Sequence, residues 1–209
     1  NINMLRVKGT LDILKNDLVF KDLRIKTNMP ADARIFNLIF GKPNIKQGQF
    51  TSDLRLNGKL SNPKILGDFH IFETNIPFLD TSMKNIEFLF RDKNIAIKSK
   101  GEVLGNDVSA EAILRNKLTK PYYIESADIY AKNMNLNRIV SRLKESEIES
   151  TNNQVQDNFR GVSIDSIIAK NVKLKADTIE LRNIHAENFR AEASINENKL
   201  FNMRDFEFN

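Results

Sequence analysis

The sequence contains no cysteine and only two histidines, His70 and His185. Without cysteine the chain can form neither a disulfide nor a thiolate site, and its compartment cannot be read from redox usage. Each histidine falls on the polar side of an alternating apolar and polar stretch, and neither has a second His or Cys at metal-ligand spacing. We therefore expect both to be surface residues, and we predict no metal site.

The usual signatures of catalysis are also missing. No serine lies in a Gly-x-Ser-x-Gly turn. Gly41-Lys42 is followed at once by Pro43 and lacks the upstream glycine of a phosphate-binding loop. Carboxylates are plentiful, but they alternate with Lys and Arg in the manner of a solvated surface. The sequence therefore predicts no catalytic residue and no cofactor, and we expect that the protein is not an enzyme.

Long hydrophobic runs are absent, and charge of one sign is not clustered. The longest apolar runs, such as residues 36–40, are interrupted by Asn37 and are too short to cross a bilayer. The net charge is +5 and the sequence pI about 9.3, but Lys and Arg are spread among Asp and Glu. The only candidate stacking patch for nucleic acid is Tyr122-Tyr123, which packing explains as well. We expect no nucleic-acid partner.

What the sequence does contain is alternation of apolar and polar residues with a period of two, which predicts β-strands that are wet on one face. The alternating stretches include residues 54–60, 65–71, 86–90, 108–114, 179–182 and 189–195. Short turn-rich connections separate them, and parallel pairing would need longer crossovers. The predicted fold is mainly β, an antiparallel meander that forms a curved open sheet or groove with two short helices.

A short repeat runs through these stretches: a charged residue, Asn or Asp, an apolar residue, any residue, and an apolar residue. Asn and Asp tolerate turn geometry, so the repeat suits the start of a strand. The copies are at 21–25, 84–88, 132–136, 170–174, 182–186, 187–191 and 204–208. The repeat predicts a strand array and indicates no reaction.

Two segments read as helices, and a polar stretch divides the chain. Pro30 suits a first helical turn and Gly41 a helix end, which predicts a helix near 31–40. Asn137 can cap a second helix, near 137–147. The domain prediction is a β-groove segment at 1–145, a polar flexible loop at 146–160 and a second β-meander at 161–209. Both ends of the sequence look like interruptions of a longer protein.

The apolar side of the strands is the candidate functional surface. In a closed sandwich such a face is dry core, whereas in an open curved sheet it lines a groove suited to acyl chains. Each buried methylene contributes about 0.8 kcal/mol, and the alternation does not separate the two cases. The predicted groove-lining residues are Leu54, Leu56, Leu60, Ile65, Phe69, Ile71, Ile86, Phe88, Phe90, Ile95, Ile97, Ile179, Leu181 and Phe189.

Three motifs carry a resemblance to a known family. In residues 52–69 a strand ends in Gly58-Lys59-Leu60, followed by Ser61-Asn62-Pro63 and then by Ile65 and Gly67. Lys84-Asn85-Ile86 follows, and residues 135–140 read Asn-Leu-Asn-Arg-Ile-Val, similar to an Asp-Leu-Asn-x-Leu-Leu helix start. The segment 50–143 resembles the AsmA/TamB group of bacterial envelope proteins, and residues 164–208 resemble the AsmA C-terminal region.

The resemblance implies a function. Members of that group are anchored in the inner membrane, extend across the periplasm, and form a hydrophobic groove proposed to carry phospholipid toward the outer membrane. The expected partners are phospholipid acyl chains and inner- and outer-membrane envelope proteins. The expected location is periplasmic, with a tether outside this sequence. The alternative is a non-catalytic structural or assembly scaffold with a closed sandwich core.

Overall fold

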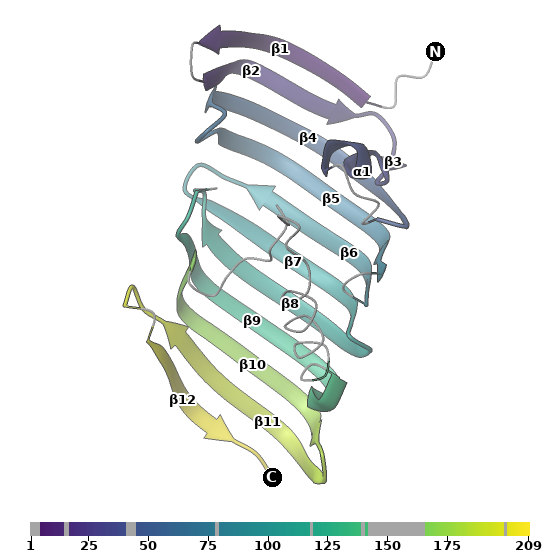
Figure 1. Ribbon diagram of the computed structural model, residues 1–209, viewed down its shortest axis with the longest axis vertical. Helices are drawn as coiled ribbons and strands as arrows, with labels where there is room; N and C mark the ends of the chain where they lie inside the picture. The colour runs from purple at the N-terminus through teal and green to yellow at the C-terminus, as the bar shows by residue number, and fades with distance from the viewer. Residues whose placement is uncertain are drawn as a thin grey trace, which may run out of the picture.

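A computed structural model describes residues 5–14, 17–40, 45–77, 80–117, 119–138, 141, 166–198 and 200–209. These residues form one sheet of 12 strands in the order β1-β2-β4-β5-β6-β7-β8-β9-β10-β11-β12, with β3 paired to β4 beside this path (Figure 1). The strands are β1 (Leu5–Leu14), β2 (Asp17–Thr27), β3 (Ala31–Asp32), β4 (Gln47–Lys59), β5 (Lys64–Ile76), β6 (Thr81–Phe90), β7 (Asn94–Val103), β8 (Asn106–Arg115), β9 (Tyr122–Asn135), β10 (Ile167–Leu181), β11 (Ile184–Ile195) and β12 (Phe201–Glu207).

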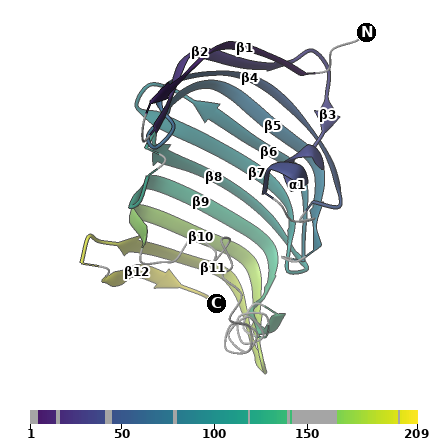
Figure 2. The same ribbon diagram turned by 45° about the horizontal axis from the view of Figure 1, so that its top comes forward.

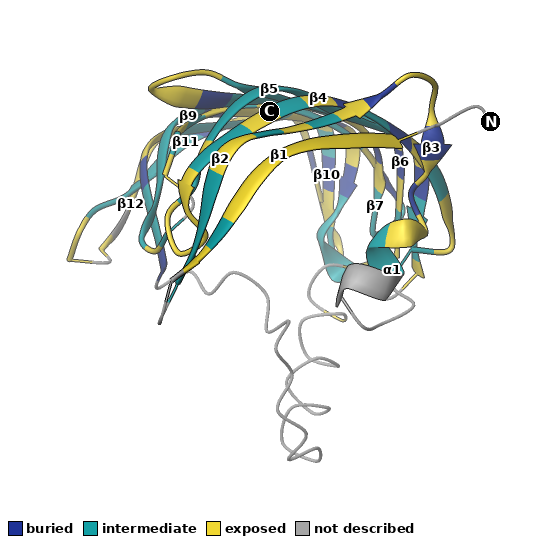
Figure 3. Cartoon of the chain, turned by 90° about the horizontal axis from the view of Figure 1, so that it is seen from above, coloured by how far each residue is buried: buried dark blue, intermediate teal, exposed yellow. Residues whose placement is uncertain are grey.

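The sheet is open and strongly curved. Figure 2 shows the strands stacked one after another, each bent across the stack, and Figure 3 shows the resulting arch seen from its end. In the described part of the chain β1 pairs only with β2 and β12 only with β11, so the sheet does not close on itself. The predicted mainly β fold with a curved open sheet is confirmed.

One strand pair departs from the antiparallel meander. β9 and β10 are parallel, whereas the other neighbours in the sheet are antiparallel. The chain between them spans about 30 residues, which is long enough for the crossover that parallel pairing requires. The strands on the two sides of this connection therefore belong to one continuous sheet.

The first predicted helix is shorter than expected. Helix α1 covers Ile35–Phe40 and not the whole of 31–40, because Ala31 and Asp32 pair with Phe50 and Gln49 as strand β3. Residues 136–138 and 141 are helical, and the rest of the predicted 137–147 helix and the 146–160 loop lie outside the described residues. In the described part of the chain no helix has the length and apolarity needed to cross a membrane.

Several copies of the Asn/Asp repeat lie at β-bulges inside strands and not at strand starts. Asp22, Asn188 and Asp205 have positive φ angles of 50°, 53° and 49°, a conformation that Asn and Asp tolerate better than most residues. At Asp22 the register of β2 against β4 shifts between Phe20 and Leu23. Because a bulge inserts one extra residue, it can bend the strand while apolar side chains on both sides of it stay on the same face.

The buried part of the molecule is small. Among the described residues the buried hydrophobic side chains are mostly alanines. About half of them form two clusters, one of Ala31, Ala33 and Phe50 and one of Ala131, Met134, Ala176 and Ile179. The largest side chain with less than 2% exposure is that of Thr74. The described residues therefore form a single layer with no thick dry core between two sheets.

Candidate functional site

The pairing register places apolar residues on one face of the sheet from strand to strand. Residues directly opposite each other on neighbouring strands point to the same face. Phe69 pairs with Phe88, which pairs with Ile97, and the row then continues to β12 without a charged residue. From β8 to β12 its members are Ala112, Ala127, Val172, Ala193 and Met203.

This face is the concave one. Helix α1 lies under the arch in Figure 3. Its Phe36 ring packs 4.9 Å from the ring of Phe50 and 5.9 Å from that of Phe69, measured between centroids. Since Phe50 and Phe69 belong to the apolar face, that face lines the inside of the arch.

The structure brings nearly all of the predicted groove-lining residues onto this face. Ile179 contributes through the cluster that it forms with Ala131, Met134 and Ala176. Leu60 is the exception, because it lies in the β4–β5 turn beyond the end of the strand, 51% exposed. The residues on the face are Leu54, Leu56, Ile65, Phe69, Ile71, Ile86, Phe88, Phe90, Ile95, Ile97, Ile179, Leu181 and Phe189.

Their exposure separates the open groove from the closed sandwich. Ile95 and Ile179 are buried, at 4% and 7% exposure, but the other predicted residues on this face are only half-buried. A closed sandwich requires a second sheet over them, and the described residues contain only one sheet. The alternative of a closed sandwich core therefore does not describe this part of the chain.

The floor of the groove changes character along the stack. At β4 to β6 it is aromatic: the rings of Phe50, Phe69 and Phe88 follow one another at 5.7 and 6.1 Å between centroids, and Phe90 stacks 6.2 Å from Phe88. At β8 to β11 the floor is mostly alanine and β-branched residues. The prediction omitted these alanines and Phe50, although the same alternation contains them.

The opposite, convex face is charged, and cross-strand ion pairs neutralise several of its side chains. Lys26 lies 2.8 Å from Asp53, and Lys98 lies 3.2 Å from Glu111 on the neighbouring strand. His70 also lies on this face, with its Nδ1 atom 3.5 Å from Glu87. Exposed pairs of this kind contribute at most about 1 kcal/mol each. The convex face is therefore a solvated surface.

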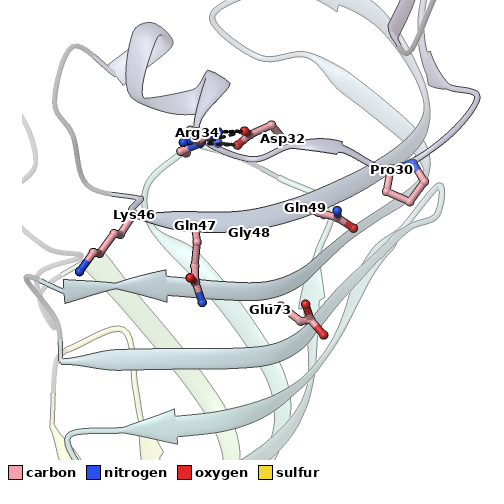
Figure 4. A pocket seen from close by; sticks show the side chains of 8 residues that line it. All are labelled: Pro30, Asp32, Arg34, Lys46, Gln47, Gly48, Gln49 and Glu73. Carbon is pink, nitrogen blue, oxygen red and sulfur yellow. Dashed lines mark hydrogen bonds and ion pairs between the residues drawn. The ribbon is translucent and has the colours of Figure 1, made fainter. Parts of the chain in front are cut away.

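An open hollow of about 680 Å³ lies at the strand ends beside α1 (Figure 4). Its charged groups are largely neutralised, because the Arg34 guanidinium hydrogen-bonds the Asp32 carboxylate and lowers the pKa of that carboxyl to about 2. Its lining residues are Pro30, Asp32, Arg34, Lys46, Gln47, Gly48, Gln49 and Glu73. Across the described ranges no three His, Cys, Asp or Glu side chains gather in a way that could hold a metal ion.

Comparison with known proteins assigns the chain to no family. No family model matches the chain, and no curated protein sequence is significantly similar to it. The groove geometry and the sequence motifs are therefore the grounds on which a function can be argued.

Proposed function

We propose that the concave apolar face binds phospholipid acyl chains, and that the chain is part of an AsmA/TamB-like protein that moves phospholipid between membranes. The observation that carries this proposal is the uncharged row that runs from Phe69 to Met203 across the concave face, over which the described residues form no second sheet. Soluble proteins rarely leave so large a contiguous apolar surface without a binding role.

The physical chemistry of the face suits a passive path. An acyl chain gains about 0.8 kcal/mol per buried methylene and needs no specific polar contact. A row without charged side chains offers similar contacts at each strand, so no single position holds the lipid tightly. The headgroup stays in water at the open side of the arch. No covalent step, cofactor or metal takes part.

The cellular setting of the proposal rests on the resemblance in residues 52–69 and 135–140. It comprises a periplasmic location, a tether in the inner membrane outside this sequence, and contacts with inner- and outer-membrane envelope proteins. Fractionation of cells that express the complete parent protein tests it, and recovery from the cytosol would contradict it.

The binding proposal is tested with a pair of adjacent residues on opposite faces. Phe88 lies on the groove floor, whereas Leu89 faces the other way, opposite Asp68 and Ala96. Phe88→Lys should reduce uptake of a fluorescent phospholipid from vesicles by about tenfold or more, since it removes roughly 2 kcal/mol of apolar contact and adds a charge. Leu89→Lys should leave uptake close to that of the unmodified chain.

A second variant keeps the groove apolar. Ala112→Trp fills the floor opposite Ala127 and should lower the amount of lipid bound while circular dichroism shows the sheet intact. Phospholipid extracted with the purified protein is quantified in parallel. The proposal is wrong if the unmodified chain takes up no phospholipid, or if Phe88→Lys and Leu89→Lys behave alike.

A further inference from the structure

One side of the arch is formed by hairpin turns that carry many cations. The β4–β5, β6–β7 and β8–β9 turns meet there, at the left-hand edge of the sheet in Figure 1. We call this edge, with the strand ends beside it, the turn rim. It borders the open side of the groove, because the concave face ends where the strands end.

The acids of the turn rim are already engaged. Arg91 binds Asp68 at 2.8 Å, and Lys64 pairs with Asp92. Arg115 binds Glu125 at 2.5 Å, and Lys170 joins the same carboxylate. The hydrogen bonds from Lys170 and Arg115 lower the pKa of the Glu125 carboxyl, and the hydrogen bond from Lys64 does the same for Asp92. These carboxylates remain charged, and each already has a cation within ion-pair distance.

Four lysines of the turn rim form no ion pair within 4.0 Å among the described residues: Lys59, Lys93, Lys117 and Lys120. Lys59 and Lys93 act only at longer range, on the carboxylates of Asp17 and Asp92. All four are exposed. Each of the three turns contains or directly follows at least one of them, and Lys117 lies 5.7 Å from the Tyr123 ring centroid. Lysines such as Lys26 and Lys98 are paired across strands elsewhere on the sheet, whereas others, such as Lys84 and Lys100, are exposed without an ion pair among the described residues. The turn rim is a local surplus of positive charge because its cations outnumber its acids.

The opposite rim carries charges of both signs. The β5–β6 and β7–β8 turns lie there, flanked by Asp80, Glu102 and Asp107, and the Arg138 guanidinium lies against Gly105 in the β7–β8 turn. The turn rim therefore has a surplus of cations, whereas the opposite edge of the groove is mixed in charge.

We propose that the turn rim selects phospholipids with anionic headgroups, an inference that rests on the proposed binding of acyl chains in the groove. A lipid held by its tails on the concave face presents its headgroup phosphate at the open side, within reach of the rim. Lysine binds phosphate as a point charge. A net negative headgroup such as phosphatidylglycerol is attracted, whereas the cationic group of phosphatidylcholine cancels much of that attraction. Exposed contacts are individually weak, but several act together and are screened by salt.

The test compares uptake of fluorescent phosphatidylglycerol and phosphatidylcholine with identical acyl chains from mixed vesicles. The unmodified chain should prefer phosphatidylglycerol by about three- to tenfold at low salt, and the preference should shrink in about 1 M salt. The fourfold variant K59Q/K93Q/K117Q/K120Q should take up the two lipids about equally, with phosphatidylcholine uptake unchanged.

A matched control removes the same charge from the convex face. K84Q/K100Q/K132Q/K175Q changes four exposed lysines away from the turn rim, and it should keep the preference. Equal uptake of the two lipids by the unmodified chain, or the same loss of preference in both fourfold variants, overturns the rim inference and leaves acyl-chain binding standing. If the unmodified chain takes up neither phosphatidylglycerol nor phosphatidylcholine, both proposals are wrong.

Discussion

At the scale of single residues, Gly67 shows most clearly how the groove depends on backbone geometry. Its φ angle is +115°, and it lies in β5 opposite Leu54 and Phe90. A Cβ atom at this position would come 1.9 Å from the carbonyl oxygen of Asp53. Only glycine therefore lets β4 and β5 approach each other here.

Gly67→Ala should lower the free energy of unfolding by about 2–3 kcal/mol, because it adds both backbone strain and a clash with β4. Gly58→Ala is the matched control: its φ is +89°, but the nearest atom to a new Cβ is 3.7 Å away. That variant should lose only about 1 kcal/mol. Denaturant unfolding measures both, and equal losses would show that the clash with Asp53 is relieved.

At the scale of elements, α1 is too short to be stable alone and depends on contacts with the sheet. The Asn37 side chain links α1 to the segment before β4. Its amide nitrogen donates to the Ile45 carbonyl, and its amide oxygen accepts from the Ile45 backbone N–H, both at 2.8 Å. Phe36 supplies the packing, against Phe50 and Phe69. The helix thus covers part of the aromatic floor of the groove.

Phe36→Ala should cost about 1–3 kcal/mol of stability, since it removes two ring–ring contacts and apolar burial. Ile35→Ala, at a residue that is 40% exposed, should change stability by about 0.5 kcal/mol or less. Urea unfolding of the two variants measures the difference. A larger loss for Ile35→Ala would mean that α1 is held by its other side.

The strands were largely predictable, but their connections and irregularities were not. Alternation in a stretch such as residues 86–90 identifies a strand and its apolar side because side chains alternate between faces. β3 was missed because two residues carry no period, and Pro30 then suggested an early helix start. The parallel β9–β10 pair and the bulge at Asp22 depend on tertiary pairing, which no local pattern encodes.

The groove itself was only half predictable. The apolar register of Phe69, Phe88 and Ile97 follows from the sequence, but whether another layer covers it does not, because open and closed sheets share the same alternation. The surplus of positive charge at Lys59, Lys93 and Lys120 could not be predicted from the sequence either. The lysines are far apart in the chain, and only the order of the strands brings their turns to one edge.

At the scale of the whole molecule, the sheet is close to one-dimensional. Each strand of the main path pairs with its neighbours in the stack, and within the described residues β1 and β12 have a partner on one side only. In such arrays local stability comes from nearest-neighbour interfaces, so the ends open first. Exposed apolar residues at these ends, Ile13 at 81% and Phe208 at 60%, fit that expectation.

Amide hydrogen exchange should therefore show a gradient along the stack. Protection should be highest in β5 to β8 and lowest in β1 and β12, with β10 between them. Mass spectrometry of peptic fragments resolves these strands. β1 and β6 are compared directly because both are 10 residues long. Equal protection in β1 and β6 would mean that the sheet unfolds as a single cooperative unit.

The number of stacked strands also sets the length of the groove. Neighbouring strands lie about 4.8 Å apart, so the path from β1 to β12, with its eleven strands, extends roughly 48 Å. Gain or loss of a hairpin would change that distance by about 10 Å while leaving the cross-section of the groove as it was. Reach and cargo are thus set by separate properties of the molecule, the number of strands and the identity of their inward side chains, and each can vary without the other.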